Sequence, residues 1–187
     1  MKYLACLAFL SACTANGPAG DHAAAIESAA AKELTAEQKW LAQLVGEWNC
    51  KAEAAMQPGA QAMKMESTES VRAIGTSWIL AESSMEIGDE PFTALLTIGW
   101  DAERGGFAGT WVDTMQAHLW VYSGTLDASG KTLTLEAEGP SFDDPDKLAR
   151  YRDAITVEGP DLKRMSSSVL GDDGQWFTFM TAEYRRR

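Results

Sequence analysis

A run of alternating residues begins at the segment Leu44-Val45-Gly46-Glu47-Trp48 and sharply limits the folds open to this chain. Apolar or small side chains share one phase, at Trp48, Cys50, Ala52, Ala54 and Met56. Polar side chains take the other phase, at Glu47, Asn49, Lys51 and Glu53. A period of two predicts a β-strand with one buried and one exposed face. Gly46 permits a tight bend into this strand, and Trp48 supplies a large ring for the core.

Turn signals rich in Gly, Asp and Pro recur at roughly ten-residue spacing from Gly46 to the end of the chain. The runs between them keep one phase, as in Phe92, Ala94, Leu96, Ile98 and Trp100. No helix-length amphipathic stretch interrupts these runs, which disfavours a parallel βαβ arrangement. The pattern predicts an all-β domain of about ten antiparallel strands, arranged as a barrel or a sandwich.

A short helix precedes the first predicted strand. Thr35 and Gln38 have the spacing of a capping box. Trp40, Leu41 and Leu44 then form one apolar face at helical spacing. We therefore expect a helix over residues 36–44 that packs against Trp48.

The first residues have the features of an export signal. Lys2 is followed by an apolar run, which is shorter than the roughly 20 residues of a membrane-spanning helix. The tetrad Leu10-Ser11-Ala12-Cys13 resembles the bacterial lipobox. The resemblance implies a signal peptide over residues 1–12, acylation of Cys13 and a cell-envelope lipoprotein. Thr14 in place of Asp then implies the outer membrane. The alternative is an ordinary signal peptide with Cys13 incidental. Residues 13–34 are rich in small residues, as expected of a partly helical tether.

The charge balance excludes a nucleic-acid role. The formal net charge is −11, and phosphate binding requires clustered Lys and Arg. Removal of the leader would take Cys6 with it, and acylation would occupy Cys13. Cys50 would then be left without a disulfide partner, as a small hydrophobic residue of the first strand.

Four landmarks occur in order along the chain: Leu44-Val45-Gly46-Glu47-Trp48, Gly99-Trp100-Asp101, Trp111 to Met115, and Tyr184 followed by Arg185 and Arg186. They resemble the lipocalin and fatty-acid-binding (calycin) group, and more narrowly an uncharacterised bacterial family of lipocalin-like domains. The resemblance implies an up-and-down β-barrel, with residues 35–187 as its domain. Gly46 and Trp48 would close one end, and Arg185, or its neighbour Arg186, would stack on Trp48. The family brings no assigned activity.

Small residues and methionines in the predicted inward phases indicate a cavity, and the alternative is an interior filled by the helix and aromatic rings. Trp111, Asp113, His118, Trp120 and Tyr122 cluster around one predicted hairpin and suit an amphipathic ligand. Whether the two strands of that hairpin present these residues to the same side is left open. Arg150 and Arg152 would hold a carboxylate head group if they face inward, whereas a surface ladder of charges is the alternative.

No cofactor or metal is predicted. His118 is the only His in the predicted domain, and the chain departs from the haem-binding barrels of this group, because Asn49-Cys50-Lys51 stands where they have Gly-x-Gly. No ligand spacing for a metal and no Gly-x-Ser-x-Gly motif occur. The sequence predicts an envelope lipoprotein that binds a small apolar or amphipathic molecule inside a barrel, and it identifies no catalytic residue. The alternatives are an enzyme acting on a small carbonyl or carboxylate compound, and a filled barrel that serves as an interaction module.

Overall fold

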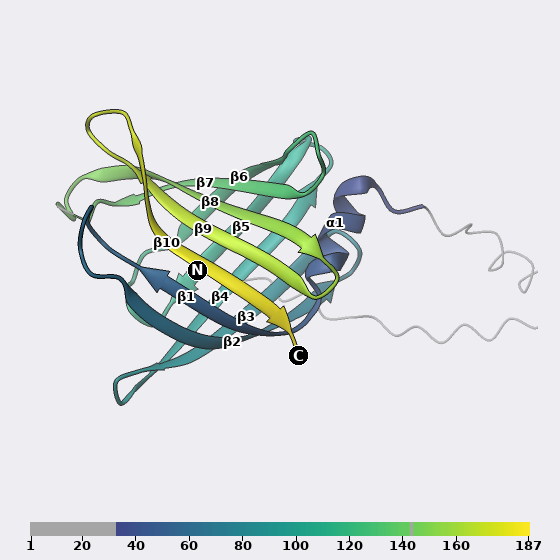
Figure 1. The fold of residues 1–187 in the computed structure, drawn as a ribbon. Coiled ribbons are helices and arrows are strands. Elements are labelled where there is room, and N and C mark those ends of the chain that lie inside the picture. The colour runs from purple at the N-terminus through teal and green to yellow at the C-terminus, as the bar shows by residue number, and fades with distance from the viewer. Residues whose placement is uncertain (1–32, 143) are drawn as a thin grey trace, which may run out of the picture. The chain divides into compact units, whose positions relative to one another are not determined.

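The computed structural model describes residues 33–142 and 144–187. Residues 36–186 form a closed antiparallel β-barrel with one short helix at one end (Figure 1). The elements are α1 (Ala36–Leu44), β1 (Gly46–Ala54), β2 (Met63–Ile74), β3 (Trp78–Ile87), β4 (Glu90–Asp101), β5 (Gly106–Asp113), β6 (Trp120–Leu126), β7 (Thr132–Pro140), β8 (Leu148–Gly159), β9 (Leu162–Leu170) and β10 (Trp176–Arg186). This confirms the predicted all-β barrel of ten strands and its short helix.

Each strand pairs with its neighbours in the chain, so the barrel has up-and-down connectivity. β1 closes the sheet by pairing with β2 on one side and with β10 on the other. Closure leaves no free sheet edge. The burial pattern of β1 alternates as predicted, with Trp48, Cys50, Ala52 and Ala54 buried. Met56 lies beyond the end of this strand.

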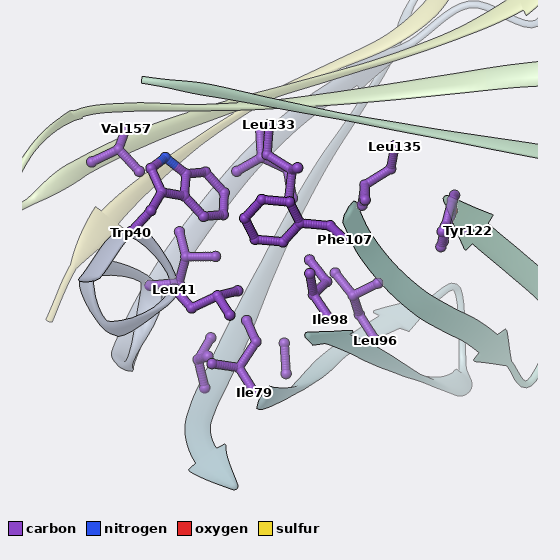
Figure 2. Close-up of a cluster of buried hydrophobic side chains, with 14 of the residues drawn as sticks. Trp40, Leu41, Ile79, Leu96, Ile98, Phe107, Tyr122, Leu133, Leu135 and Val157 are labelled. Carbon is purple, nitrogen blue, oxygen red and sulfur yellow. The ribbon is translucent and has the colours of Figure 1, made fainter. Parts of the chain in front are cut away.

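The helix α1 fills one end of the barrel. Its capping box forms as expected, because Thr35 accepts a hydrogen bond from the Gln38 N–H and the Gln38 side chain accepts one from the Thr35 N–H. Trp40, Leu41 and Leu44 are buried. Figure 2 shows Trp40 and Leu41 pointing toward Phe107, and the rings of Trp40 and Phe107 meet edge to face at 5.9 Å. Within the described residues, no helix is long and apolar enough to span a membrane.

Arg186 connects the end of α1 to the barrel. Its guanidinium lies 4.2 Å from the centre of a Trp48 ring, and it donates hydrogen bonds to the carbonyls of Gln43 and Val45. Trp48 Nε1 donates to the Leu44 carbonyl at 2.9 Å. These donors satisfy carbonyls at the end of α1, where a cation is also favoured by the helix dipole.

The stacking residue is therefore Arg186, and the prediction of Arg185 is corrected. Arg185 is 66% exposed and pairs with Glu183 on the outer face. The physical reason is strand alternation, because Arg186 shares its phase with Ala182 and Tyr184, which pack inside the barrel.

A buried ion pair crosses the barrel interior between β2 and β9. Lys163 Nζ donates a hydrogen bond to Glu69, and both side chains are 7% exposed. The ammonium also lies 4.7 Å from a Trp48 ring centre and 4.6 Å from that of Tyr184. Burial lowers the pKa of Lys163, and Glu69 opposes that shift. Cys50 is buried near this pair, and burial raises the pKa of its thiol, as expected of an unreactive cysteine.

The predicted signal peptide, the lipidation site Cys13 and nearly all of the predicted tether lie outside the described residues.

Candidate functional site: a methionine-lined cavity

The strand ends opposite α1 surround a cavity of about 710 Å³. Its walls come from the end of β1, the start of β2, the β3–β4 and β5–β6 turns, and the adjoining parts of β8, β9 and β10. The helix and the core around Phe107 fill the other end. The interior is thus filled at one end and hollow at the other. A volume of this size falls within the range of small-molecule sites.

Methionine is the distinctive residue of this cavity. Seven of the eight methionines of the chain line it: Met56, Met63, Met65, Met85, Met115, Met165 and Met180. We call it the methionine cavity. Met115 is 71% exposed and Met63 is 60% exposed, so part of the ring faces solvent at the mouth. Unbranched thioether side chains adapt to apolar guests of varied shape.

Four aromatic rings form one wall, and we call them the aromatic cluster: Trp120, Phe142, Tyr151 and Phe179. Adjacent rings stand nearly perpendicular, at 84° for Trp120 and Tyr151 and 87° for Phe142 and Phe179. The corresponding centroid distances are 4.9 and 5.0 Å. Tyr151 links the two pairs, since it contacts both Phe142 and Phe179. Edge-to-face packing favours this arrangement and rigidifies the wall.

One acidic group belongs to this wall. The Tyr122 hydroxyl donates a hydrogen bond of 2.6 Å to Asp153 Oδ2, and Ser167 is a second hydrogen-bond partner of Asp153. All three residues line the cavity. Burial raises the pKa of the Asp153 carboxyl, partly offset by hydrogen bonds from Ser167 and Tyr122. Burial together with the Asp153 charge also holds the pKa of Tyr122 well above its usual value, so Tyr122 stays a donor at neutral pH.

Four of the residues predicted around the β5–β6 hairpin line the methionine cavity together: Trp111, Asp113, Trp120 and Tyr122. Both strands of the hairpin thus present these side chains to the inside. Asp113 has a structural task, because its carboxylate accepts hydrogen bonds from Trp111 Nε1 at 2.9 Å and from the N–H groups of Met115 and Gln116. It orders the turn that carries Met115.

The other predicted ligand residues lie elsewhere. His118 packs its ring edge to face on Trp120 at 4.8 Å, but it is not among the residues that line the cavity. Arg150 and Arg152 both bind Glu136 on the outer face of β7 and β8, and Arg152 also stacks on Trp176 at 4.0 Å. These arginines form the surface ladder and do not face the cavity.

Sequence reasoning missed Asp153 and the aromatic cluster beyond Trp120. A signal for Asp153 was present, because Tyr151, Asp153, Ile155 and Val157 share one phase of β8 and three of them are apolar. An acidic residue in an apolar phase indicates a buried polar group. Phe142 and Phe179 come from two distant segments, and only barrel closure brings them together.

No metal centre is found in the part of the chain that the structure describes, where no three His, Cys, Asp or Glu side chains gather. A second hollow of about 690 Å³ involves β1, β2, β8, β9 and β10. Its charged residues are already paired with one another: Lys51 with Glu66, Lys64 with Glu53, and Arg164 with Glu183. The methionine cavity is therefore the better candidate site.

The fold has relatives among solved structures. The S-type phycobiliprotein lyase CPES from Guillardia theta is 13% identical, with a TM-score of 0.56 over 80% of this chain and 92% of that chain. Rv2717c from M. tuberculosis is 14% identical, with a TM-score of 0.60 over 83% of this chain and 99% of that chain. At this identity the likeness shows the fold alone. No curated protein matches the sequence.

The family described as "Protein of unknown function (DUF1579)" matches residues 33–186. The landmarks in the sequence pointed to a family without an assigned activity, and this match agrees with them. Because the match covers most of the chain, the protein belongs to the DUF1579 family.

Proposed function

We propose that this protein binds a small apolar or amphipathic molecule in the methionine cavity. The observation that carries the proposal is a cavity of about 710 Å³, lined by seven methionines and six aromatic residues, in a barrel whose other end is filled. Burial of apolar ligand surface there would provide roughly 25 cal/mol per Å², before ordering costs. One solved barrel of the same fold is named a phycobiliprotein lyase, which is consistent with a fold that can act on another molecule.

Titration with N-phenyl-1-naphthylamine, a neutral dye that fluoresces in apolar surroundings, tests this proposal. The chain should bind the dye, and Ala54→Trp, which places a large ring in the cavity, should weaken binding by about tenfold or more. Val121→Trp is the matched control, because Val121 is 61% exposed and lies outside the cavity. Equal loss of binding in both variants, or no binding by the unchanged chain, would refute the proposal. Native mass spectrometry of protein from its host would then identify the ligand.

We further propose that the protein is a lipoprotein of the cell envelope, held by Cys13 on a tether of residues 13–34 and facing the periplasm from the outer membrane. The lipobox-like tetrad Leu10-Ser11-Ala12-Cys13 supports this location. Several acyl chains on one cysteine would anchor the chain firmly. Cys13→Ser should abolish labelling by radioactive palmitate, and labelling that persists in the variant would rule the anchor out.

A second candidate function is catalysis on a small carbonyl compound. It is favoured by the contact of 2.6 Å between Tyr122 and Asp153, which places a hydroxyl and a carboxylate with a raised pKa side by side in the cavity. Such a carboxylate is suited to act as a general base. A panel of small ketones in deuterated water would reveal proton abstraction as deuterium uptake next to the carbonyl. Uptake that Asp153→Asn abolishes would support catalysis, and uptake equal to that without protein would exclude it for the compounds of the panel.

A further inference from the structure

We infer that the methionine cavity selects amphiphiles with a positively charged, ammonium-type head group, held between Asp153 and the aromatic cluster. This inference rests on the proposed binding function and specifies the chemical class of the ligand. It differs from the expectation that Arg150 or Arg152 would hold a carboxylate, because both arginines pair with Glu136 on the outer face.

The charges around the cavity favour a cation. Five charged residues line it, and four of them are acidic: Glu86, Asp113, Asp153, and Glu66, which pairs with Lys51. Among the described residues, Lys64 is the only basic one in the lining, and it is 81% exposed and pairs with Glu53 at 3.4 Å. The buried Lys163 is outside the lining and is paired with Glu69. An anionic head group would therefore lie near mostly acidic side chains, and no unpaired basic side chain is present in the described part of the lining.

Three of the four aromatic residues in the lining that carry an N–H or O–H donor already use it within the protein. Trp111 Nε1 donates to Asp113, the Tyr122 hydroxyl donates to Asp153, and the Tyr151 hydroxyl donates to the Pro140 carbonyl. These donors are thus occupied by the protein itself. The Asp153 carboxylate offers about four lone-pair sites, and Tyr122 and Ser167 use two of them. A charged carboxylate is costly at a buried site, and a bound cation would offset that cost.

The aromatic cluster provides a second attraction for a cation at the same wall. The faces of aromatic rings carry negative charge density, and a cation within about 6 Å of a ring centre is stabilised. Tyr151 and Asp153 are two residues apart on β8 and both line the cavity, which places the carboxylate beside the rings. A methylated ammonium group fits such surroundings, because it presents apolar methyl groups around a positive charge. The methionines then remain for the alkyl tail.

Three ligands with the same ten-carbon tail separate head-group preference from tail binding: decyltrimethylammonium, 1-decanol and decanoate. We would titrate each by calorimetry into the full-length chain carrying Cys13→Ser, which cannot be acylated and so adds no competing chain. We expect the cation to bind about tenfold or more tightly than decanoate, and more tightly than decanol. Asp153→Asn should remove the advantage of the cation. It should leave decanol affinity within about twofold, because the binding of a neutral ligand does not depend on the charge of Asp153.

Two further variants complete the design. Glu82→Gln makes the same change of charge on an exposed residue of β3 outside the cavity, and should leave all three affinities unchanged. Phe179→Leu removes one ring of the aromatic cluster and should weaken the cation more than decanol. The inference is overturned if decanoate binds as tightly as the cation, or if Asp153→Asn leaves cation affinity unchanged while decanol still binds. Failure of all three ligands to bind would instead count against the proposed function itself.

Discussion

At the scale of one residue, the surroundings of Gly46 explain why a glycine stands two residues before Trp48. Its φ of 136° is a backbone conformation that favours glycine, and a Cβ there would overlap the Arg186 guanidinium. The same guanidinium stacks on Trp48 and caps the end of α1. Gly46, Trp48 and Arg186 thus meet at one place, although Arg186 lies at the opposite end of the domain sequence.

Gly46→Ala should therefore destabilise the protein by about 2 kcal/mol or more, through backbone strain and displacement of Arg186. Gly88→Ala is the matched control, because Gly88 also has a positive φ, of 64°, but nothing lies near its added Cβ. That variant should lose only about 1 kcal/mol. Urea unfolding measures both. Equal losses in the two variants would mean that the contact with Arg186 contributes little.

Asp153 leads to a prediction about pH. Burial raises its pKa in the folded protein above that in the unfolded chain, so the folded protein binds the proton more tightly. The contribution of Asp153 to stability is then fully present below about pH 4 and is lost as pH rises through the raised folded pKa. Asp153→Asn should remove this loss. We expect the variant to be more stable than the unchanged chain at pH 7 and to show no advantage near pH 4.

Asp127→Asn provides a comparison of opposite sign. Hydrogen bonds from Ser129 and from backbone N–H groups lower the pKa of Asp127, so its contribution to stability is present at neutral pH and is lost as pH falls. This variant should be less stable than the unchanged chain at pH 7. A matching response of the two variants to pH would contradict both assignments.

At the scale of elements, the pair of Lys163 and Glu69 joins β9 to β2 across the barrel interior. Lys163→Met should cost about 3–5 kcal/mol, because it leaves the Glu69 carboxylate buried with Ser83, at 3.4 Å, as its one remaining side-chain partner among the described residues. The double variant Glu69→Met with Lys163→Met should recover most of that loss, since two apolar side chains leave no uncompensated charge. Urea unfolding of the single and double variants tests this. A double variant as unstable as the sum of the two single variants would mean that the two side chains are not coupled, and it would contradict this expectation.

The sequence predicted those elements whose burial alternates or repeats cleanly. β1 and α1 were placed from apolar phases and a capping box that the structure reproduces. The ends of strands were harder. The irregular pairing between Thr178 and Met180 obscures the phase of β10, and the phase at its end decides whether Arg185 or Arg186 faces Trp48.

The candidate site was predicted only in part for a related reason. Trp111, Asp113, Trp120 and Tyr122 were identified, but their shared direction depends on the β5–β6 turn, whose path the residue pattern does not specify. Asp153 stands between Arg152 and the apolar end of β8, where it is easily taken for one more surface charge. The depth at which α1 packs decides which part of the barrel is filled and which is hollow. This depth is set only when the barrel closes.

At the scale of the whole molecule, the methionines separate the hollow end from the filled end. Among the described residues, the core at α1 contains no fully buried methionine and only Met165 packs against it, whereas seven methionines line the cavity. Mild treatment with hydrogen peroxide should therefore abolish binding of N-phenyl-1-naphthylamine while the barrel stays folded. The reason is that sulfoxides make the cavity polar and leave the core around Phe107 unchanged. Peptide mass spectrometry should find Met115 and Met63 oxidised first, because they are the most exposed.

Circular dichroism of the same samples separates loss of binding from loss of fold, and methionine sulfoxide reductases should restore binding if the thioethers are responsible. Unfolding in step with the loss of dye would mean that the methionines hold the barrel together. Dye binding that survives full oxidation would mean that the aromatic cluster, rather than the thioethers, provides the apolar surface. The first result would mean that the methionines belong to the core. The second would mean that the ligand binds nearer the wall that carries Asp153.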